Sequence, residues 1–285
     1  MFLNRSLVYK QVFFFLLMAF SLIFILGTYF YFYSRDAIIN RTYDQLTSIR
    51  ETKKNQIEYF FNERINNARY LAQSSTAKLI YKDINENHNI NGERLKKEIG
   101  FEYYGFLNIY FVTQKSSDSE LKIMSLVEEN SSILNGKPSK PMMDLWAKVS
   151  HGENFAMSDY IKRFESDSTP VIWIGIPFNS DIKKDVDSKM IVFEISSTSI
   201  TNTLLKYSAE KGFGYSGEAY LVGDDFKLRS DSRFIKNAIL NTEVKSEAAV
   251  KALSGEQGKM ITRDYRNVEV YSSYAPINIF GHKWA

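Results

Sequence analysis

Cysteine is absent from this 285-residue sequence, and histidine is scarce. Without a thiol the chain cannot form a disulfide, a thiolate zinc site, an iron–sulfur cluster or a cysteine nucleophile. The histidines His88, His151 and His282 do not have the spacing of metal ligands. G-x-S-x-G, P-loop and H-E-x-x-H motifs are also missing, and no two carboxylates form an evident pair in an apolar setting. We therefore expect no catalytic residue, no metal and no cofactor.

A strong excess of one charge is missing too. The chain has 36 Lys+Arg against 33 Asp+Glu, a net charge of +3, without a basic stripe. This balance gives no reason to expect nucleic acid as a partner. Hydrophobic residues make up 44% and aromatic residues 15%, too many for a disordered chain. The length allows one large domain or two domains of about 100–150 residues.

A long apolar run lies near the N-terminus. Residues 12–33 read VFFFLLMAFSLIFILGTYFYFY, and a helix of roughly 20 such residues spans a bilayer. Its aromatic end at residues 29–33 suits a membrane interface. Arg5 and Lys10 precede the run with no acidic residue between them, so we expect residues 1–11 to be cytoplasmic and the rest to lie outside.

Two other interpretations of this run stay open. A cleaved signal peptide has a shorter apolar core and a small-x-small cleavage site, which the bulky run lacks. A buried core helix is the other alternative. We favour an uncleaved, single-pass membrane anchor.

Residues 34–84 have the pattern of one long amphipathic helix. Proline and glycine are absent from residues 35–81, a length on the order of 65 Å as a helix. Apolar residues recur at steps of three and four, namely Ile39, Tyr43, Leu46, Ile49, Ile57, Phe60, Ala68 and Leu71. This stripe packs on the chain's own globular part alone, or its first half also pairs with a second copy; we favour a parallel homodimer. The polar segment at 85–92 should end the helix.

The remaining sequence contains an internal similarity. Residues 145–160 (LWAKVSHGENFAMSDY) and 248–265 (AAVKALSGEQGKMITRDY) each predict a short helix, a Gly-Glu pair, a strand and an Asp-Tyr pair. Strands are predicted around both copies, at 106–112, 121–127, 171–178 and 190–196 in the first and at 218–222, 226–231, 269–277 and from 282 in the second. Each copy then forms an α+β module, an antiparallel sheet of about five strands with a helix on one face. Chance similarity of two amphipathic segments is the alternative.

GFGYSG at residues 212–217 matches G-x-G-x-x-G formally. In dinucleotide-binding folds this motif follows a strand and opens a helix, whereas here it follows a predicted helix and opens a predicted strand. We therefore interpret the glycines as a tight entry into the second module.

Aromatic residues of the first module are the candidates for a ligand site. Apolar pockets with a few polar groups bind small molecules, and a carboxylate beside aromatic rings suits a ligand cation. The candidates are Tyr110, Trp146, Asp159, Tyr160 and Trp173. In the alternative interpretation these aromatics only fill the core, and Asp159, matched by Asp264 in the second copy, has a structural role such as capping.

Residues 212–234 (GFGYSGEAYLVGDDFKLRSDSRF) closely resemble the second-module signature of double-Cache sensor domains. The anchor, the long helix, the Asp-Tyr pairs and the ending YAPINIFGHKWA add to the likeness, which covers residues 35–285. The resemblance implies an extracytoplasmic sensor in the inner membrane of a bacterium. It would have two PAS-like modules on a long helix and a small ligand in the membrane-distal module. Its output would be a chemoreceptor, histidine kinase or cyclase domain.

The resemblance divides the chain into a tail, an anchor, a stalk and two modules. The expected segments are a cytoplasmic tail at 1–11, a transmembrane helix at 12–33, a stalk helix at 34–84, a membrane-distal module at 85–196, a connecting helix at 197–211 and a membrane-proximal module at 212–285 with an incomplete last strand. The chain is expected to be truncated before a second transmembrane helix.

The amino-acid-binding members of that family carry an Arg followed closely by Trp and Tyr. Here Asp144 and Leu145 precede Trp146, so the resemblance does not support an amino acid ligand. The alternative function is a periplasmic protein-interaction module that signals through a partner protein instead of a small ligand.

Overall fold

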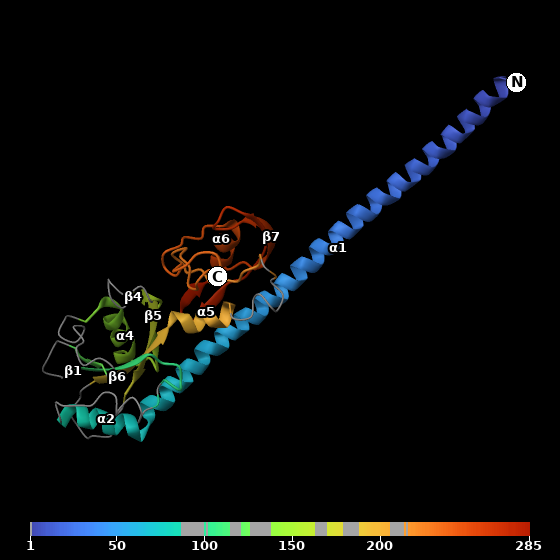
Figure 1. Cartoon of the computed structure of the whole chain (residues 1–285). Coiled ribbons are helices and arrows are strands. Elements are labelled where there is room, and N and C mark those ends of the chain that lie inside the picture. The colour runs from blue at the N-terminus through green and yellow to red at the C-terminus, as the bar shows by residue number, and fades with distance from the viewer. Residues whose placement is uncertain are drawn as a thin grey trace.

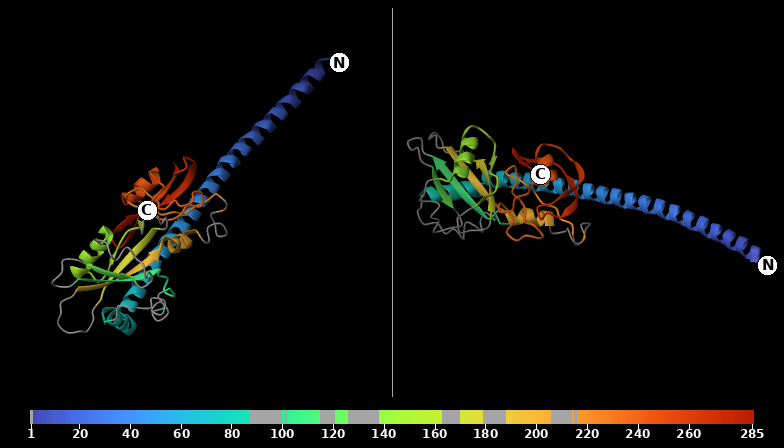
Figure 2. Two further views of the ribbon diagram at one scale, coloured as in Figure 1. Left: turned by 60° about the vertical axis from the view of Figure 1, so that its left-hand side comes forward. Right: turned by 90° about the horizontal axis from the view of Figure 1, so that it is seen from above.

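The computed structural model describes residues 2–86, 100, 102–114, 121–125, 138–162, 170–178, 188–205, 214 and 216–285. His88, most of the polar segment at 85–92, Gly212 and residues 206–211 of the expected connecting helix lie outside the described residues. Helix α1 protrudes from two smaller units that pack beside its second half, and the N-terminus lies at its far end (Figures 1 and 2).

Helix α1, Phe2–Gln73, joins the apolar run to the stalk without interruption. Apolar side chains are exposed along its first part, whereas its second part is buried against both units. The predicted stripe is confirmed there, because Ile57, Phe60, Ala68 and Leu71 are all buried. Amphipathic packing thus accounts for the stalk half of α1, whereas residues 7–38 are exposed throughout the described structure.

The stalk is interrupted before its expected end. Ser74 separates α1 from α2, Ser75–Glu86, which turns off the line of α1 (Figure 1). The Ser74 hydroxyl donates to Leu71 O (2.7 Å) and accepts from Ala77 N (3.1 Å). Ser74 therefore ends one helix and caps the next, which is a role that serine favours.

The first unit is built on a six-stranded antiparallel sheet. Its strands run in the order β2-β1-β6-β5-β3, and β4 also pairs with β5. They are β1 Asn108–Gln114, β2 Lys122–Ser125, β3 Ala156–Met157, β4 Ile161–Lys162, β5 Pro170–Pro177 and β6 Ser188–Ser196. The four strands predicted in this unit are confirmed as β1, β2, β5 and β6, with described ends shifted by one or two residues.

Both faces of this sheet are covered, because side chains alternate between two clusters along each strand. Helices α1 and α2 cover one face, where Ile109, Phe111 and Phe193 are buried. Helix α4, Lys140–Ser150, covers the other face, where Tyr110 and Trp173 are buried. Helix α5, Ser197–Leu205, follows β6 directly and packs beside α1 (Figure 1).

The C-terminal unit, residues 216–285, has less regular sheet structure. It contains α6 Glu247–Leu253, the pair β7 Gly258–Arg263 and β8 Glu269–Tyr274, and the pair β9 Ile277–Ile279 and β10 His282–Trp284. Within the described residues these form two separate two-stranded sheets. The α+β class is confirmed, with one main sheet and small additional sheets.

The strands predicted at 218–222 and 226–231 do not form, and this prediction was wrong. Only isolated bridges join Val222 to Leu228 and Gly223 to Trp284. Phe226 has a φ of 61°, in the left-handed region that interrupts a strand. In addition, Leu221 N donates to the Ser230 hydroxyl (3.1 Å) instead of to a backbone carbonyl. Together these features replace the expected ladder with a tight irregular hairpin.

Candidate functional site

A buried carboxylate lies at the centre of the α4 face of the first unit. Glu194 on β6 is 0% exposed, and its Oε2 accepts hydrogen bonds from Tyr110 Oη (2.8 Å) and Trp173 Nε1 (3.0 Å). Because Trp173 on β5 is paired directly with Glu194, and β1 flanks β6 on the other side, the sheet register brings the three side chains together. A carboxylate out of water needs such donors, since burial without them costs several kcal/mol.

Helix α4 adds a third aromatic residue to this group, because half-buried Trp146 packs against the same cluster. The Tyr110 and Trp173 rings lie 5.9 Å apart, edge to face. The structure therefore brings together three of the predicted site residues, Tyr110, Trp146 and Trp173. Glu194 was missed, although it is the only charged residue in the apolar strand MIVFEIS, which was the available signal.

Tyr160 lies elsewhere, on the face of the sheet that packs against the C-terminal unit. Its ring stacks on Trp284 at 5.9 Å. Burial raises the pKa of Tyr160 well above its usual value, and the nearby Asp159 carboxylate adds to this effect. Tyr160 is thus part of the junction between the units, away from the Tyr110–Trp173 cluster.

Asp159 also lies at the junction, in a bidentate ion pair. Its Oδ1 and Oδ2 accept from Arg229 Nε (2.9 Å) and Nη2 (2.8 Å), and Arg229 Nη1 donates to Asp225 Oδ1 (2.9 Å). Burial alone would lower the pKa of Arg229, but these hydrogen bonds outweigh it and raise the pKa. Paired planar groups of this kind fix geometry as well as energy, so Asp159 joins the two units. Its predicted ligand contact stays a prediction.

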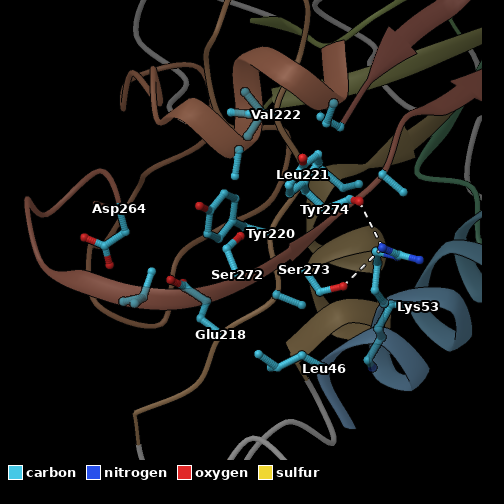
Figure 3. A pocket seen from close by; sticks show the side chains of 18 of the residues that line it. Leu46, Lys53, Glu218, Tyr220, Leu221, Val222, Asp264, Ser272, Ser273 and Tyr274 are labelled. Carbon is cyan, nitrogen blue, oxygen red and sulfur yellow. Dashed lines mark hydrogen bonds between the residues drawn. The ribbon is translucent and has the colours of Figure 1, made fainter. Parts of the chain in front are cut away.

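A cavity of about 220 Å³ lies between α1 and the C-terminal unit. Figure 3 shows its walls, with Leu46 and Lys53 from α1 on one side and Glu218, Tyr220 and Asp264 on the other. Its apolar lining includes Leu221, Val222, Ala248, Ala249, Ala252 and Ile277. Among the described residues, no three His, Asp or Glu side chains are placed to share a metal ion.

Both acidic side chains described at the wall of this cavity have partners on the protein. Asp264 Oδ2 accepts from Arg266 Nε (2.8 Å) and Nη2 (2.6 Å). Glu218 accepts from Arg233 N (2.6 Å) and from Tyr265 Oη (2.5 Å). Burial and the hydrogen bond to Glu218 raise the pKa of Tyr265, so its hydroxyl keeps its proton as the donor. Asp264 is therefore neutralised by an ion pair, and Glu218 is hydrogen-bonded, in both cases to groups of the protein itself.

No protein-family model and no curated protein matches this sequence. Solved structures do match it over most of its length. The periplasmic sensory domain of the Campylobacter jejuni chemoreceptor Tlp1 matches with a TM-score of 0.56 and 15% identity, covering 86% of this chain and 93% of that one. The ligand-binding domain of the Pseudomonas aeruginosa PAO1 amino acid chemoreceptor PctC, in complex with GABA, gives 0.58 and 13%, covering 85% and 96%.

The extracellular domain of the putative histidine kinase soHK1S-Z6 matches similarly, with a TM-score of 0.56, 13% identity and coverage of 88% and 95%. At such identities the likeness concerns the fold. The expected double-Cache resemblance is thereby confirmed at the level of fold: this chain has the double-Cache-like architecture of the sensory domains of chemoreceptors and histidine kinases.

Proposed function

We propose that this chain is the extracytoplasmic, small-molecule-sensing part of a membrane-bound signalling receptor. The observation that carries the proposal is helix α1. It contains the one described stretch that is long and apolar enough to cross a membrane, and none of that stretch is buried within the chain's own fold. The same helix continues into the core of a sensory-domain fold. A displacement of either unit along α1 would therefore reach the membrane without an intervening joint.

The proposed organisation follows the sequence. The tail at 1–11 is cytoplasmic, residues 12–33 cross the membrane once, and the modules at 85–196 and 212–285 lie outside, joined by the stalk at 34–84 and the connecting helix at 197–211. Support for a second PAS-like module comes from its strand order. The bridges run from Leu228 to Val222 and from Gly223 to Trp284, and β10 pairs with β9. This order parallels β2-β1-β6-β5 of the first sheet.

Within the first unit we propose that α4 moves aside to admit a ligand to the Glu194 cluster, which consists of Glu194, Tyr110, Trp173 and Trp146 and is packed beneath α4 in the structure. One buried carboxylate that accepts from Tyr110 and Trp173, with Trp146 packed against the same hydrophobic cluster, suits a small ligand with a cationic nitrogen, because a carboxylate and ring faces both attract positive charge. GABA, the molecule in the PctC complex, carries such a nitrogen, but the Arg-Trp-Tyr pattern of the amino-acid-binding family members is absent here. We therefore propose an amine-bearing ligand without committing to an amino acid.

The test is a thermal-shift screen of the full chain in detergent micelles against amines, organic acids, sugars and purines. An amine that stabilises the wild type should lose at least about tenfold in affinity in Glu194→Gln, since a charge-assisted hydrogen bond contributes about 1.5–3 kcal/mol. Glu153→Gln, an exposed change in the same unit, is the control. If no compound stabilises the wild type, or if both variants bind equally, this ligand site is refuted. Capture of one specific protein from membrane extracts would then favour the partner-protein alternative.

We also propose that two copies pair in parallel along the membrane-near half of α1. Ile38 lies five residues beyond the apolar run that ends at Tyr33, and it is 66% exposed within the described structure. Since the chain has no cysteine, single cysteines introduced from residue 36 to residue 42 would report pairing without background. Disulfide-linked dimers should recur every three to four positions. Uniformly absent cross-links would refute the dimer.

A further inference from the structure

We propose that the cavity between α1 and the C-terminal unit is a second ligand site, and that it takes a small organic monocarboxylate. This site is separate from the Glu194 cluster, and the proposal stands whether or not the first unit binds an amine. It follows from the room, the lining and the charge of the cavity.

The volume of the cavity is due to small side chains on α6. Helices α4 and α6 begin with the same backbone at their capping serines, Ser139 (φ −65°, ψ 153°) and Ser246 (φ −63°, ψ 152°). In α4, the buried residues three and six positions after the cap are Met142 and Leu145. In α6 the corresponding positions hold Ala249 and Ala252, which both line the cavity. The α6 face is therefore hollow where the α4 face is filled.

The lining is apolar and the space is small. Leu221, Val222 and Ile277 are buried along the walls, beside the three alanines of α6. An apolar cavity of about 150 Å³ can hold benzene, so a cavity of about 220 Å³ holds a ligand of roughly six to eight heavy atoms. A short hydrocarbon chain with one polar end fits such a lining.

The charge left over in the cavity is positive. Glu218 and Asp264 have donors on the protein, as described above, and Arg50 is paired with Glu51. Lys53 and Lys54 remain, and among the described residues no carboxylate lies within 4.0 Å of either ammonium group. Lys53 Nζ donates to Thr203 O (2.8 Å), and burial lowers the pKa of Lys53. A cation without a counter-charge at a partly buried site favours an anionic ligand.

A ligand in this cavity would contact α1 itself. Leu46, Lys53 and Ile57 of α1 line the cavity, and α1 continues from them to the apolar stretch. Figure 3 shows Lys53 and Leu46 facing the wall that carries Glu218 and Tyr220. Ligand binding in the C-terminal unit could thus displace α1, and with it the apolar stretch, without involving the first unit.

Isothermal titration of the full chain in detergent micelles with straight-chain monocarboxylates of two to six carbons tests the proposal. Butyrate is the reference probe and butylamine is the matched cation of similar length. We expect saturable butyrate binding that depends on Lys53, whereas any butylamine binding, at Glu194 of the first unit, should be the same in wild type and in Lys53→Met. Lys53→Met should weaken butyrate at least tenfold, and Ala249→Met with Ala252→Leu, which copies the α4 residues, should abolish binding. Glu153→Gln, an exposed change in the first unit, is the control and should leave butyrate affinity unchanged, whereas Glu194→Gln shows whether the first unit contributes.

Absence of saturable binding for every carboxylate of the series overturns the proposal. So does butylamine binding that the filled variant abolishes together with butyrate binding, or butyrate affinity that is within twofold of wild type in the filled variant. If the doubly filled variant does not fold, Ala252→Val alone and Lys53→Met decide in the same way. Butyrate binding that depends on Glu194 but not on Lys53 would place the ligand in the first unit, which refutes the second site and leaves the sensing function standing.

Discussion

Each unit has a short helix with matching caps, α4 in the first and α6 in the C-terminal unit, but the side chains that the two helices bury differ in size. Helices α4 and α6 start at serines of matching backbone, and each ends at a glycine with a φ of 99°, Gly152 and Gly255. The Gly152 amide donates to Val149 O (3.0 Å) and the Gly255 amide donates to Ala252 O (2.9 Å). Such left-handed caps favour glycine, which explains the glycine of the repeated Gly-Glu pair. The caps therefore fix the backbone, while the residues between them decide whether the space beneath is solid or hollow.

A tyrosine–glutamate hydrogen bond also occurs in both units, in different surroundings. Tyr110 donates to the fully buried Glu194, whereas Tyr265 donates to Glu218 on the wall of the cavity. The first pair is part of a packed core that α4 covers. The second borders open space next to α1. The two units thus share the backbone of their capped helices, but the region beneath α4 is packed, whereas a cavity lies beside α6.

The largest expected effect comes from exchanging the helix residues between the units. Leu145→Ala removes a side chain that is 2% exposed, and we expect it to lower the free energy of unfolding by about 2–5 kcal/mol. Ala252→Leu fills existing space, so its effect should stay within about 1 kcal/mol of wild type. Thermal unfolding of the full chain in micelles measures both. An Ala252→Leu variant as unstable as Leu145→Ala would show that α6 lies over a solid core.

A somewhat smaller effect is expected at the junction of the units. Arg229 is 3% exposed, and Arg229→Met leaves Asp159 without its bidentate partner. We expect a loss of about 3 kcal/mol, because a partly buried carboxylate then lacks its counter-charge. Gly223 contributes room for this contact, since a Cβ there would lie 2.3 Å from the Arg229 guanidinium carbon.

A double-mutant cycle with Asp159→Asn isolates the pair. The coupling energy should be about 1–3 kcal/mol if the two units are held together by this contact. Additive losses would mean that Asp159 and Arg229 act independently and that other contacts hold the units together, such as the stacking of Tyr160 on Trp284 and the contact between His282 Nε2 and Met157 O (3.0 Å).

Local patterns explain how much of this architecture could be predicted. The apolar stripe of the stalk, the apolar strands β5 and β6, and the glycine caps each depend on residues close in sequence, so they were recognisable. The break at Ser74 was not, because one serine in a polar-faced helix is ordinary until its hydroxyl is seen to cap α2. The irregular hairpin after Glu218 was missed for a similar reason, since its apolar alternation resembles that of a strand.

The site depended on contacts that no local pattern reveals. Asp159 meets Arg229 across 70 residues, and Tyr110 meets Glu194 across 84. To identify which aspartate pairs with Arg229 and which tyrosine pairs with Glu194, the sheet register and the position of the C-terminal unit must be known. The cavity was equally hidden, because Ala249 and Ala252 are good helix formers in their own right, and their meaning appears only beside Met142 and Leu145 of α4.

The smallest expected effect separates the two tyrosine–glutamate pairs. Tyr110→Phe removes one donor from a carboxylate that is 0% exposed, which should cost about 1–3 kcal/mol. Tyr265→Phe should cost only about 0.5–1 kcal/mol, because Glu218 is half-buried, keeps the Arg233 amide as a donor and can recover a water molecule from the cavity. Unfolding of both variants under one condition gives the difference. Equal losses would mean that the Glu218 pair is as dry as the Glu194 pair, so that no water molecule from the cavity replaces the lost donor.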